Sequence, residues 1–376
     1  MEFAKTLPDA RVDADWIASH IDDPSVRFVE IDVSATAYNA GHIPSAVLWN
    51  AYTDLRHSDY RPVSAAELRD LLCKSGVTPD MTVVFYGYGA HLGFWLLKSH
   101  GHDRVRLMDG SREQWQIAGQ NWSTDVPTPA RSQYVLSAQD AFFSSKEDVQ
   151  EMIGQPSRVI LDTRSKAEYD GERFWPSGAT AGAGRAGRIP GAVHLPVELL
   201  RTDDGTFRSA GEMLRVMRDR GITAETEVVT YCTIGNRASQ AWFALKYLLE
   251  YHDVRVYYGS WAEWGKVADA PIETLWGLSR SLRIAGRTKR TAERVYDHSE
   301  SPVRPCPDVS SRRTSRSRNS RVVGAGRAVR TRPALCCRLP PQSPPRWANH
   351  VSTRTTQLDD RRRAELRLDE VEQISI

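Results

Sequence analysis

The chain contains one ordered set of short motifs twice, and this duplication constrains its fold more than any other feature. Three pairs of segments match in order: "FVEIDVSATAYNAGHIPSAVLWN" (28–50) with "VILDTRSKAEYDG" and, after an insertion, "GRIPGAVHLP" (187–196); "TVVFYGYG" (82–89) with "EVVTYCTIG" (227–235); and "VRLMDGSREQW" (105–115) with "VRVYYGSWAEW" (254–264). Self-similar segments in a preserved order indicate a repeated structural unit. The sequence therefore predicts two copies of one unit, in residues 1–130 and 131–277, joined by the polar, proline-containing segment 123–133.

The pattern within each copy predicts an α/β fold. Short apolar runs typical of strands alternate with helical patterns such as "SAAELRDLLCKSG" in the first copy and "SAGEMLRVMRDRG" in the second. Strands that alternate with helices favour a parallel sheet with helices on both faces. We therefore expect two tandem domains, each a parallel sheet flanked by helices.

A cysteine in the second copy occupies a position that favours reactivity. The run Val228 to Tyr231 is β-branched and aromatic, as in a buried strand, and apolar residues recur at helical spacing from Ala238 onward. Cys232 therefore lies in the turn between a strand and a helix. Backbone N–H groups at a helix start have no intrahelical partner and stabilise an anion, so a thiolate is favoured there.

The residues that follow Cys232 support the same chemistry. Gly235 can turn tightly, and Arg237 is a permanent cation within reach of a group bound to the sulfur. The pattern thus favours a nucleophilic cysteine, while a buried cysteine that acts as a small apolar residue is the alternative. In the first copy Gly87 aligns with Cys232, which leaves that copy without a nucleophile, and we expect Cys73 to be structural.

The segment after residue 277 differs in composition from the rest. Residues 1–277 hold 28 Lys and Arg against 37 Asp and Glu, whereas residues 278–376 hold 22 against 10. Stretches such as "SSRRTSRSRNSR" bury too little apolar surface to offset the entropy of ordering, so we expect 278–376 to be a disordered basic tail. Weak nucleic-acid binding is one role for it, and an extension without function, even a translation artefact, is the other.

Cysteine usage and hydropathy bear on the compartment. Five cysteines without paired spacing argue against a disulfide framework, and the adjacent Cys336 and Cys337 lack the partners of a metal site. The start of the chain has no signal-type segment, and no run of 18 apolar residues occurs. These patterns predict a cytoplasmic protein that does not use a membrane.

Taken together, the motifs resemble the rhodanese family of sulfurtransferases. The tandem copies, the two "G-H/R-I-P-x-A-V" elements, the loop "CTIGNRAS" and "GSWAEW" are similar to the two-domain type, thiosulfate sulfurtransferase, over residues 10 to 272. The resemblance implies an inactive first domain and a catalytic second one. It also implies that Cys232 takes the outer sulfur of thiosulfate as a persulfide and passes it to cyanide or a thiol, without a metal or organic cofactor.

The resemblance further implies which residues bind the donor. The backbone N–H groups of the loop would surround the terminal sulfur, and the residues concerned are Thr233, Ile234, Gly235, Asn236, Arg237 and Ala238. Arg237 would attract the anionic donor. Arg173, in the insertion "GERFWPSGATAGAGRAG", is a further candidate donor contact on a surface loop, whereas Arg164 and Arg188 are expected to tie loops together. Glu168 stands where related enzymes often have a substrate-binding arginine.

Three other functions stay open at this point. Thr233 and Ile234 are neutral, a feature of relatives that use 3-mercaptopyruvate in place of thiosulfate. A non-catalytic, sulfur-carrying or binding scaffold is a second alternative. Cysteine phosphatases place five residues between the cysteine and the arginine, whereas four separate Cys232 from Arg237, so the loop favours a single sulfur over a phosphate.

Overall fold

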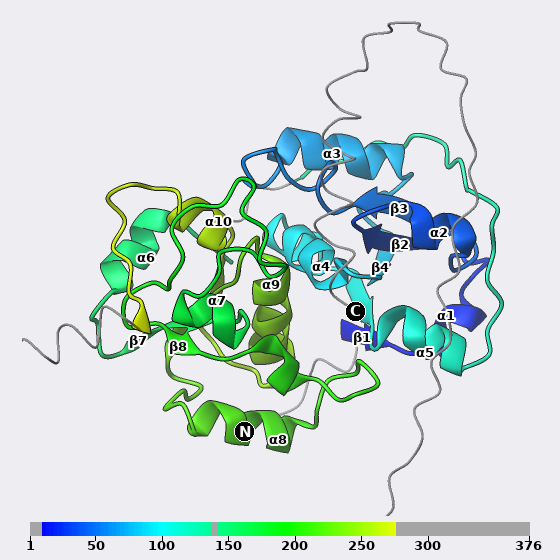
Figure 1. Cartoon of the computed structure of the whole chain (residues 1–376). Coiled ribbons are helices and arrows are strands. Elements are labelled where there is room, and N and C mark those ends of the chain that lie inside the picture. Colours follow the sequence, from blue (N-terminus) through cyan, green and yellow to red (C-terminus); the bar gives the residue numbers. More distant parts are fainter. Residues whose placement is uncertain (1–9, 137–141, 276–376) are drawn as a thin grey trace, which may run out of the picture. The chain divides into compact units, whose positions relative to one another are not determined.

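The computed structural model describes residues 10–136 and 142–275, which fall within one compact unit. The predictions made for the tail, residues 278–376, lie outside the described residues. The two copies expected from the sequence are both present as α/β units (Figure 1). The exact domain limits at residues 130 and 277 stay predictions.

The first copy is a five-stranded parallel sheet with the strand order β1-β5-β4-β2-β3. Its strands are β1 (Arg11–Val12), β2 (Val26–Asp32), β3 (Val47–Asn50), β4 (Thr82–Tyr86) and β5 (Val105–Met108). Its helices are α1 (Ala14–Ser19), α2 (Thr36–Ala40), α3 (Ala65–Lys74), α4 (Ala90–Ser99) and α5 (Ser111–Ile117).

The second copy repeats this topology, with the strand order β6-β10-β9-β7-β8 and parallel pairing throughout. Its strands are β6 (Phe143–Ser144), β7 (Arg158–Asp162), β8 (Val193–His194), β9 (Glu227–Tyr231) and β10 (Val254–Tyr257). Its helical segments are α6 (Lys146–Met152), α7 (Lys166–Asp170), the 3₁₀ turn η2 (Val197–Leu200), α8 (Ala210–Arg218), α9 (Asn236–Phe243), the π-helical turn η3 (Ala244–Leu248) and α10 (Ser260–Trp264). The identical strand order confirms the predicted duplication.

Local sequence signals account for the equivalent helices α3 and α8. Each begins with a capping box, in which a serine at the N-cap and a glutamate three residues later satisfy each other's backbone N–H groups. The pairs are Ser64 with Glu67 and Ser209 with Glu212. The match "SAAE" and "SAGE" in the two copies thus fixes the same helix start twice.

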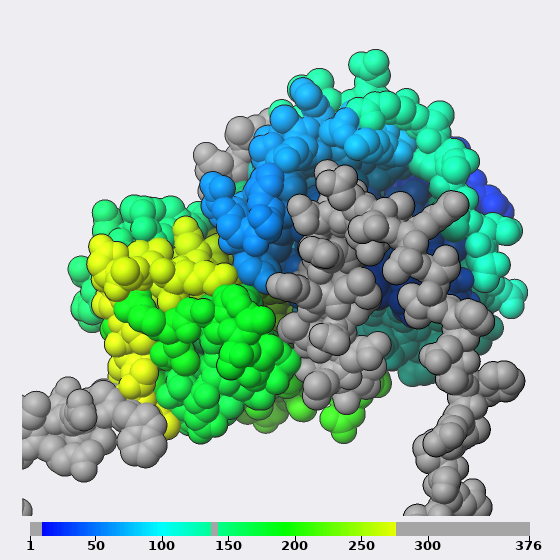
Figure 2. Space-filling view, turned by 45° about the horizontal axis from the view of Figure 1, so that its top comes forward, coloured from blue at the N-terminus to red at the C-terminus, as the bar shows by residue number. Residues whose placement is uncertain are grey.

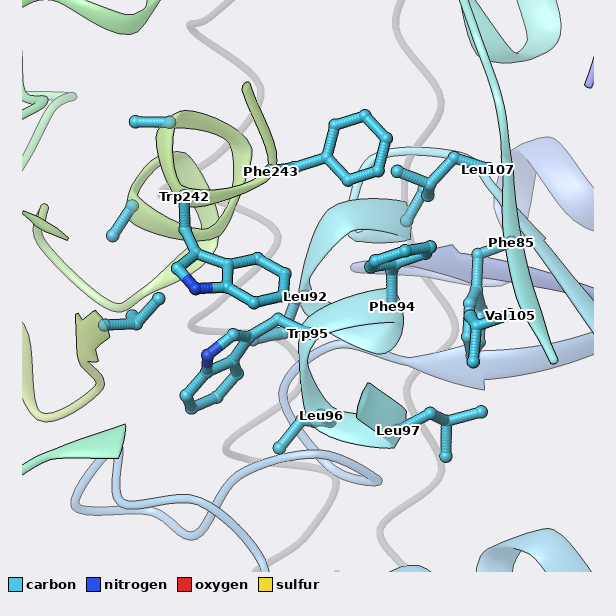
Figure 3. Packing of buried hydrophobic residues seen from close by; sticks show 14 of the residues in the cluster. Phe85, Leu92, Phe94, Trp95, Leu96, Leu97, Val105, Leu107, Trp242 and Phe243 are labelled. Atoms are coloured by element: carbon cyan, nitrogen blue, oxygen red, sulfur yellow. The ribbon is translucent and has the colours of Figure 1, made fainter. Parts of the chain in front are cut away.

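The two copies share a core between α4 and α9, the helices that follow their central strands (Figure 1). The rings of Phe94 on α4 and Phe243 on α9 lie 5.0 Å apart in an edge-on arrangement. Figure 3 shows these two rings together with Trp95 and Trp242 in one apolar cluster. Because α4 is buried on nearly every side, the first copy uses this helix for packing.

The insertion in the second copy is less exposed than expected. Its glycine and alanine content predicted a surface loop, but Phe174 and Trp175 are both buried in the second core cluster. Trp175 also packs against Tyr60 of the first copy, with ring centroids 5.4 Å apart. Two aromatic side chains thus anchor the start of a segment whose small residues suggested no anchor.

Candidate functional site

Cys232 lies at the carboxyl end of the central strand β9, directly before the first turn of α9, as the sequence predicted. Its side chain is buried, at 1% exposure. Gly235, the N-cap of α9 with φ of +94°, donates its backbone N–H to Cys232 Sγ at 3.0 Å. The left-handed backbone that only glycine adopts without strain therefore directs an N–H group at the sulfur.

The start of α10 holds the loop from the other side. Cys232 donates its N–H to Ser260 Oγ at 3.2 Å, and Trp261 donates its N–H to the Cys232 carbonyl at 2.9 Å. Ala262 N–H likewise bonds to the Thr233 carbonyl at 2.9 Å. The "GSWAEW" motif therefore fixes the backbone on which the cysteine stands.

Glu168 connects the two ends of the cysteine loop. Arg237 Nη1 and Nη2 donate to its two carboxylate oxygens at 2.9 Å each, a bidentate ion pair. Thr233 Oγ1 donates to Glu168 Oε1 at 2.5 Å and accepts a bond from Arg237 Nη2 at 2.7 Å. We call these three residues the loop clamp. They close the segment from 233 to 237 around the cysteine.

The loop clamp keeps Glu168 ionised. Burial by itself would raise the pKa of this carboxyl, but the Arg237 charge and the hydrogen bonds from Arg237, Thr233 and Ser165 outweigh that effect and lower the pKa to about 2. The same ion pair raises the pKa of Arg237. Both partners are therefore charged at neutral pH, and each neutralises the other.

The remaining loop residues differ in what their side chains contact. Ile234 packs in the second core cluster and Ala238 in the first. Asn236 Nδ2 donates to the Tyr88 carbonyl of the first copy at 3.2 Å. Ile234, Asn236 and Ala238 can thus serve a ligand at the sulfur chiefly through their backbone N–H groups.

The arginines singled out from the sequence separate into two kinds. Arg164 is fully buried in an ion pair with Asp162 at 2.6 Å, and Arg188 pairs with Glu273 at 2.9 Å, so both tie loops together as expected. Arg173 forms no hydrogen bond or ion pair with the cysteine loop among the described residues, and its buried Nε has no partner there. Its role as a donor contact stays a prediction.

Sequence reasoning missed several residues that shape the site. Glu168 had a visible signal, because it completes a Ser-x-x-Glu capping box with Ser165 and replaces an expected arginine. Tyr258, whose hydroxyl donates to the Leu55 carbonyl at 3.1 Å, joins the two copies beside the cysteine loop. Nothing in the local sequence indicates this contact, since 203 positions separate the partners.

The geometry defines a class of protein: a tandem α/β protein with one cysteine held in a backbone loop at a helix start. A sequence model described as the rhodanese-like domain matches residues 13–118 and 145–266. The chain belongs to the rhodanese family, and both copies carry the domain.

Several known proteins are similar to this chain over most of their length. "Sulfur carrier protein TtuD" of Thermus thermophilus is 38% identical over 275 residues, which span 70% of this chain and 96% of that protein. A protein of Haloferax volcanii named "Putative thiosulfate sulfurtransferase" is 38% identical over 278 residues, with the same coverage of 70% and 96%. These relatives place the chain among proteins of sulfur transfer.

Solved structures of EanB also match. The wild-type EanB structure is 27% identical with a TM-score of 0.65, covering 71% of this chain and 69% of that one. A second structure, of EanB with ergothioneine covalently linked to a persulfide cysteine, is 26% identical with a TM-score of 0.65 and covers 72% of each chain. EanB thus shares this fold, and the persulfide cysteine is that of one of its variants.

No helix in 10–136 or 142–275 is long and apolar enough to span a membrane. The same residues contain no cluster of three or more His, Cys, Asp or Glu side chains that could hold a metal ion.

Proposed function

We propose that this protein moves the outer sulfur of thiosulfate to a thiol or cyanide acceptor through a persulfide on Cys232. The observation that carries the proposal is the 3.0 Å contact between the Gly235 N–H and Cys232 Sγ at the start of α9. N–H groups that already point at the sulfur stabilise a thiolate and, after transfer, the negatively charged outer sulfur of a persulfide.

The reaction has two displacement steps. The Cys232 thiolate attacks the outer sulfur of thiosulfate, a new S–S bond forms, and the old S–S bond breaks as sulfite leaves with the electron pair. The acceptor then attacks the outer sulfur of the persulfide, and the Cys232 thiolate leaves. Charge is conserved in both steps, and neither needs an external oxidant or reductant.

The proposal assigns roles to the other loop residues. Backbone N–H groups from Thr233 to Ala238 surround the transferred sulfur, and Arg237 adds positive potential although Glu168 neutralises much of its charge. Arg173 is kept as a donor contact from the insertion. The first domain is proposed to be catalytically inactive because Gly87 replaces the cysteine, and the protein is proposed to act in the cytoplasm.

Mass spectrometry of the purified protein tests the mechanism. Thiosulfate should add about 32 Da, one sulfur atom, to the peptide that contains Cys232, and cyanide should remove it as thiocyanate. Initial rates should show the parallel lines of a ping-pong reaction. A Cys73→Ser variant, which removes another buried free thiol, serves as the control and should load normally. Loading that survives Cys232→Ser would contradict the proposal.

One observation favours 3-mercaptopyruvate as the donor. Thr233 and Ile234 add no charge to the loop, and Arg237 is bound to Glu168, so the loop itself presents no uncompensated cation for a sulfonate. The same loading assay with 3-mercaptopyruvate compares the two donors. Faster loading from it would replace thiosulfate in the proposal and leave the persulfide unchanged.

A further inference from the structure

Arg56, in the loop after β3 of the first copy, is a buried cation that forms no ion pair with any carboxylate of the described residues. Its side chain is 3% exposed. Nη1 donates to the Ala51 carbonyl at 2.8 Å, whereas the buried Nε and Nη2 have no hydrogen-bond partner and no carboxylate pairs with them in the described residues. Leaving a buried guanidinium unpaired is costly. This arrangement therefore indicates a place for an anion.

Arg56 lies beside the cysteine loop of the second copy. Its guanidinium carbon is 5.7 Å from the ring centroid of Tyr258. The same ring borders Gly235, because a Cβ built on that glycine would lie 3.5 Å from Tyr258 Cδ2. Since the Gly235 N–H contacts Cys232 Sγ, the Tyr258 ring lies beside both the Arg56 guanidinium and the cysteine loop.

The electrostatics of Tyr258 confirm that both groups are near it. Burial raises the pKa of this phenol to about 12, the Arg56 guanidinium lowers it through its charge and through a polar contact with the hydroxyl, and a Cys232 thiolate raises it. The phenol is neutral at physiological pH and donates its own hydrogen to the Leu55 carbonyl. It can thus lie beside the guanidinium without compensating its charge.

The geometry of the two unpartnered groups of Arg56, Nε–H and Nη2–H, indicates which kind of anion would fit. Nε–H and Nη2–H lie on one side of a guanidinium and point in parallel, which suits two oxygens of a carboxylate or a sulfonate. The loop's own arginine, Arg237, already uses a bidentate arrangement on Glu168. Arg56 is therefore better placed than Arg237 to bind an added oxyanion.

We propose that Arg56 binds the anionic end of the sulfur donor, a sulfonate or a carboxylate, while the donor's sulfur meets Cys232. This inference rests on the proposed function and extends it: the copy that lacks a cysteine supplies the donor-binding cation. Cys232 and Arg56 are both covered in this structure, so neighbouring side chains must move for a donor to enter. In Figure 2 the blue surface of the first copy meets the green and yellow surface of the second copy. Contacts between the two copies include that of Lys266 Nζ, which lies 5.3 Å from the Tyr60 ring centroid.

Donor binding without chemistry tests the proposal directly. In a Cys232→Ser background, calorimetry should show that Arg56→Met weakens the affinity for a donor by at least about 10-fold, the loss expected for a charge-assisted pair of hydrogen bonds. Thiosulfate and 3-mercaptopyruvate are titrated separately, so a loss for one of them identifies a sulfonate or a carboxylate ligand. Equal affinity with and without Arg56, including no measurable binding in either protein, overturns the proposal.

Arg188 provides a matched control, since it is also 3% exposed but is paired with Glu273. Arg188→Met should lower the melting temperature, because it leaves the half-buried Glu273 carboxylate without its ion-pair partner. Donor binding should be unchanged. Arg56→Met removes an unpaired charge and should keep or raise the melting temperature. If Arg56→Met lowers the melting temperature as much as Arg188→Met does and leaves the donor affinity unchanged, Arg56 is only structural.

An uncharged donor separates this proposal from the proposed function. Dimethyl trisulfide has a transferable central sulfur but no oxyanion. The Cys232 thiolate attacks that sulfur and methanethiolate leaves; the methanethiolate then attacks the remaining methylthio group, so dimethyl disulfide departs and the persulfide stays on Cys232. Arg56→Met should therefore be loaded from it at the wild-type rate. If Arg56→Met slows loading from dimethyl trisulfide by the same factor as loading from thiosulfate, Arg56 does not act by binding the anion. If wild-type protein is loaded by no donor, the proposed function fails, while calorimetry on the Cys232→Ser protein still decides whether Arg56 binds the anion.

Discussion

The two loops that follow the central strands, at Gly87 and at Cys232, share a frame but differ in what they can hold. Each begins after an equivalent strand, β4 or β9, and each donates its first N–H to a serine hydroxyl, Ser111 at 2.6 Å and Ser260 at 3.2 Å. Both end at a glycine N-cap, but the second loop has one residue more before its cap. The extra residue gives the chain room to curve around a sulfur.

The backbone of the first loop also excludes a side chain. Gly87 has φ of +88°, and a Cβ at this position would lie 2.7 Å from the Ile31 carbonyl oxygen. An L-residue there is both strained and in steric conflict. The first copy therefore lacks the geometry for a cysteine as well as the cysteine itself.

Among the described residues, the loop clamp has no counterpart in the first copy. Tyr38 matches Tyr169, because each hydroxyl donates to the carbonyl of the equivalent alanine, Ala46 at 2.6 Å and Ala192 at 2.7 Å. Ala37 therefore stands where the second copy has Glu168. His91, at the position of Arg237 in the helix, lies 3.0 Å from Arg201 Nη2. A carboxylate and a guanidinium thus close the loop that carries the cysteine, and the first loop has no equivalent ion pair among the described residues.

Moving the cysteine between the loops should have the largest effect. A Cys232→Ser, Gly87→Cys double variant should lose thiosulfate loading and turnover to background, because the first loop cannot accommodate the side chain. In Gly87→Cys alone, peptide mass mapping should find one sulfur, on Cys232, which also shows that the protein is folded. A second sulfur on the introduced cysteine would show that the first loop can also hold a reactive cysteine.

Removing the carboxylate of the loop clamp should have the next largest effect. Glu168→Gln should lower the free energy of unfolding by about 3 kcal/mol at pH 7, as expected from a native pKa of about 2 against an ordinary value of 4.5. Because the native pKa is depressed, this stability is complete above about pH 5 and is lost as the pH falls from 4.5 towards 2.

Chemical unfolding of wild type and Glu168→Gln across that pH range measures the difference. Glu212→Gln is the matched control, since Glu212 completes the same kind of capping box on α8, but its side chain is 42% exposed and its ion pair with Arg208 is long, at 3.9 Å. Glu212→Gln should lower the free energy of unfolding much less than Glu168→Gln does. The free energy of unfolding of the wild type exceeds that of Glu168→Gln by an amount that should shrink as the pH falls. If this amount stays constant down to pH 2, the ion pair is not the source of the stability.

A substitution at Gly87 should have the smallest effect of the three. Gly87→Ala should lower the free energy of unfolding by about 2 kcal/mol more than Gly119→Ala does. Both glycines have positive φ, but of the two only Gly87 has atoms within 4 Å of the added methyl group. Thermal or urea unfolding measures both variants. Cys232 should still be loaded in Gly87→Ala, and equal costs for the two glycines would mean that the first loop tolerates a side chain.

The sequence by itself determined the duplication, the parallel α/β class and the place of Cys232 between a strand and a helix. These features depend on periodicity and end signals within a few residues, such as the capping boxes of Ser64 and Ser209 and the glycine before α9. Local interactions of this kind act wherever the same short pattern occurs. The alignment of the two copies likewise showed that Gly87 replaces the cysteine in the first copy.

Only the tertiary structure decided which side chains surround the cysteine. Glu168 reaches Arg237 across 69 positions, because β7 and β9 are neighbours in one parallel sheet and their carboxyl ends meet at one edge. Tyr258 joins Leu55 across 203 positions, because the two copies pack against each other. The lack of a partner for Arg56 is also a property of packing, since an arginine in a sequence does not reveal whether a carboxylate lies beside it. Pairing across such separations is set by how the sheets and helices pack, which no local pattern encodes.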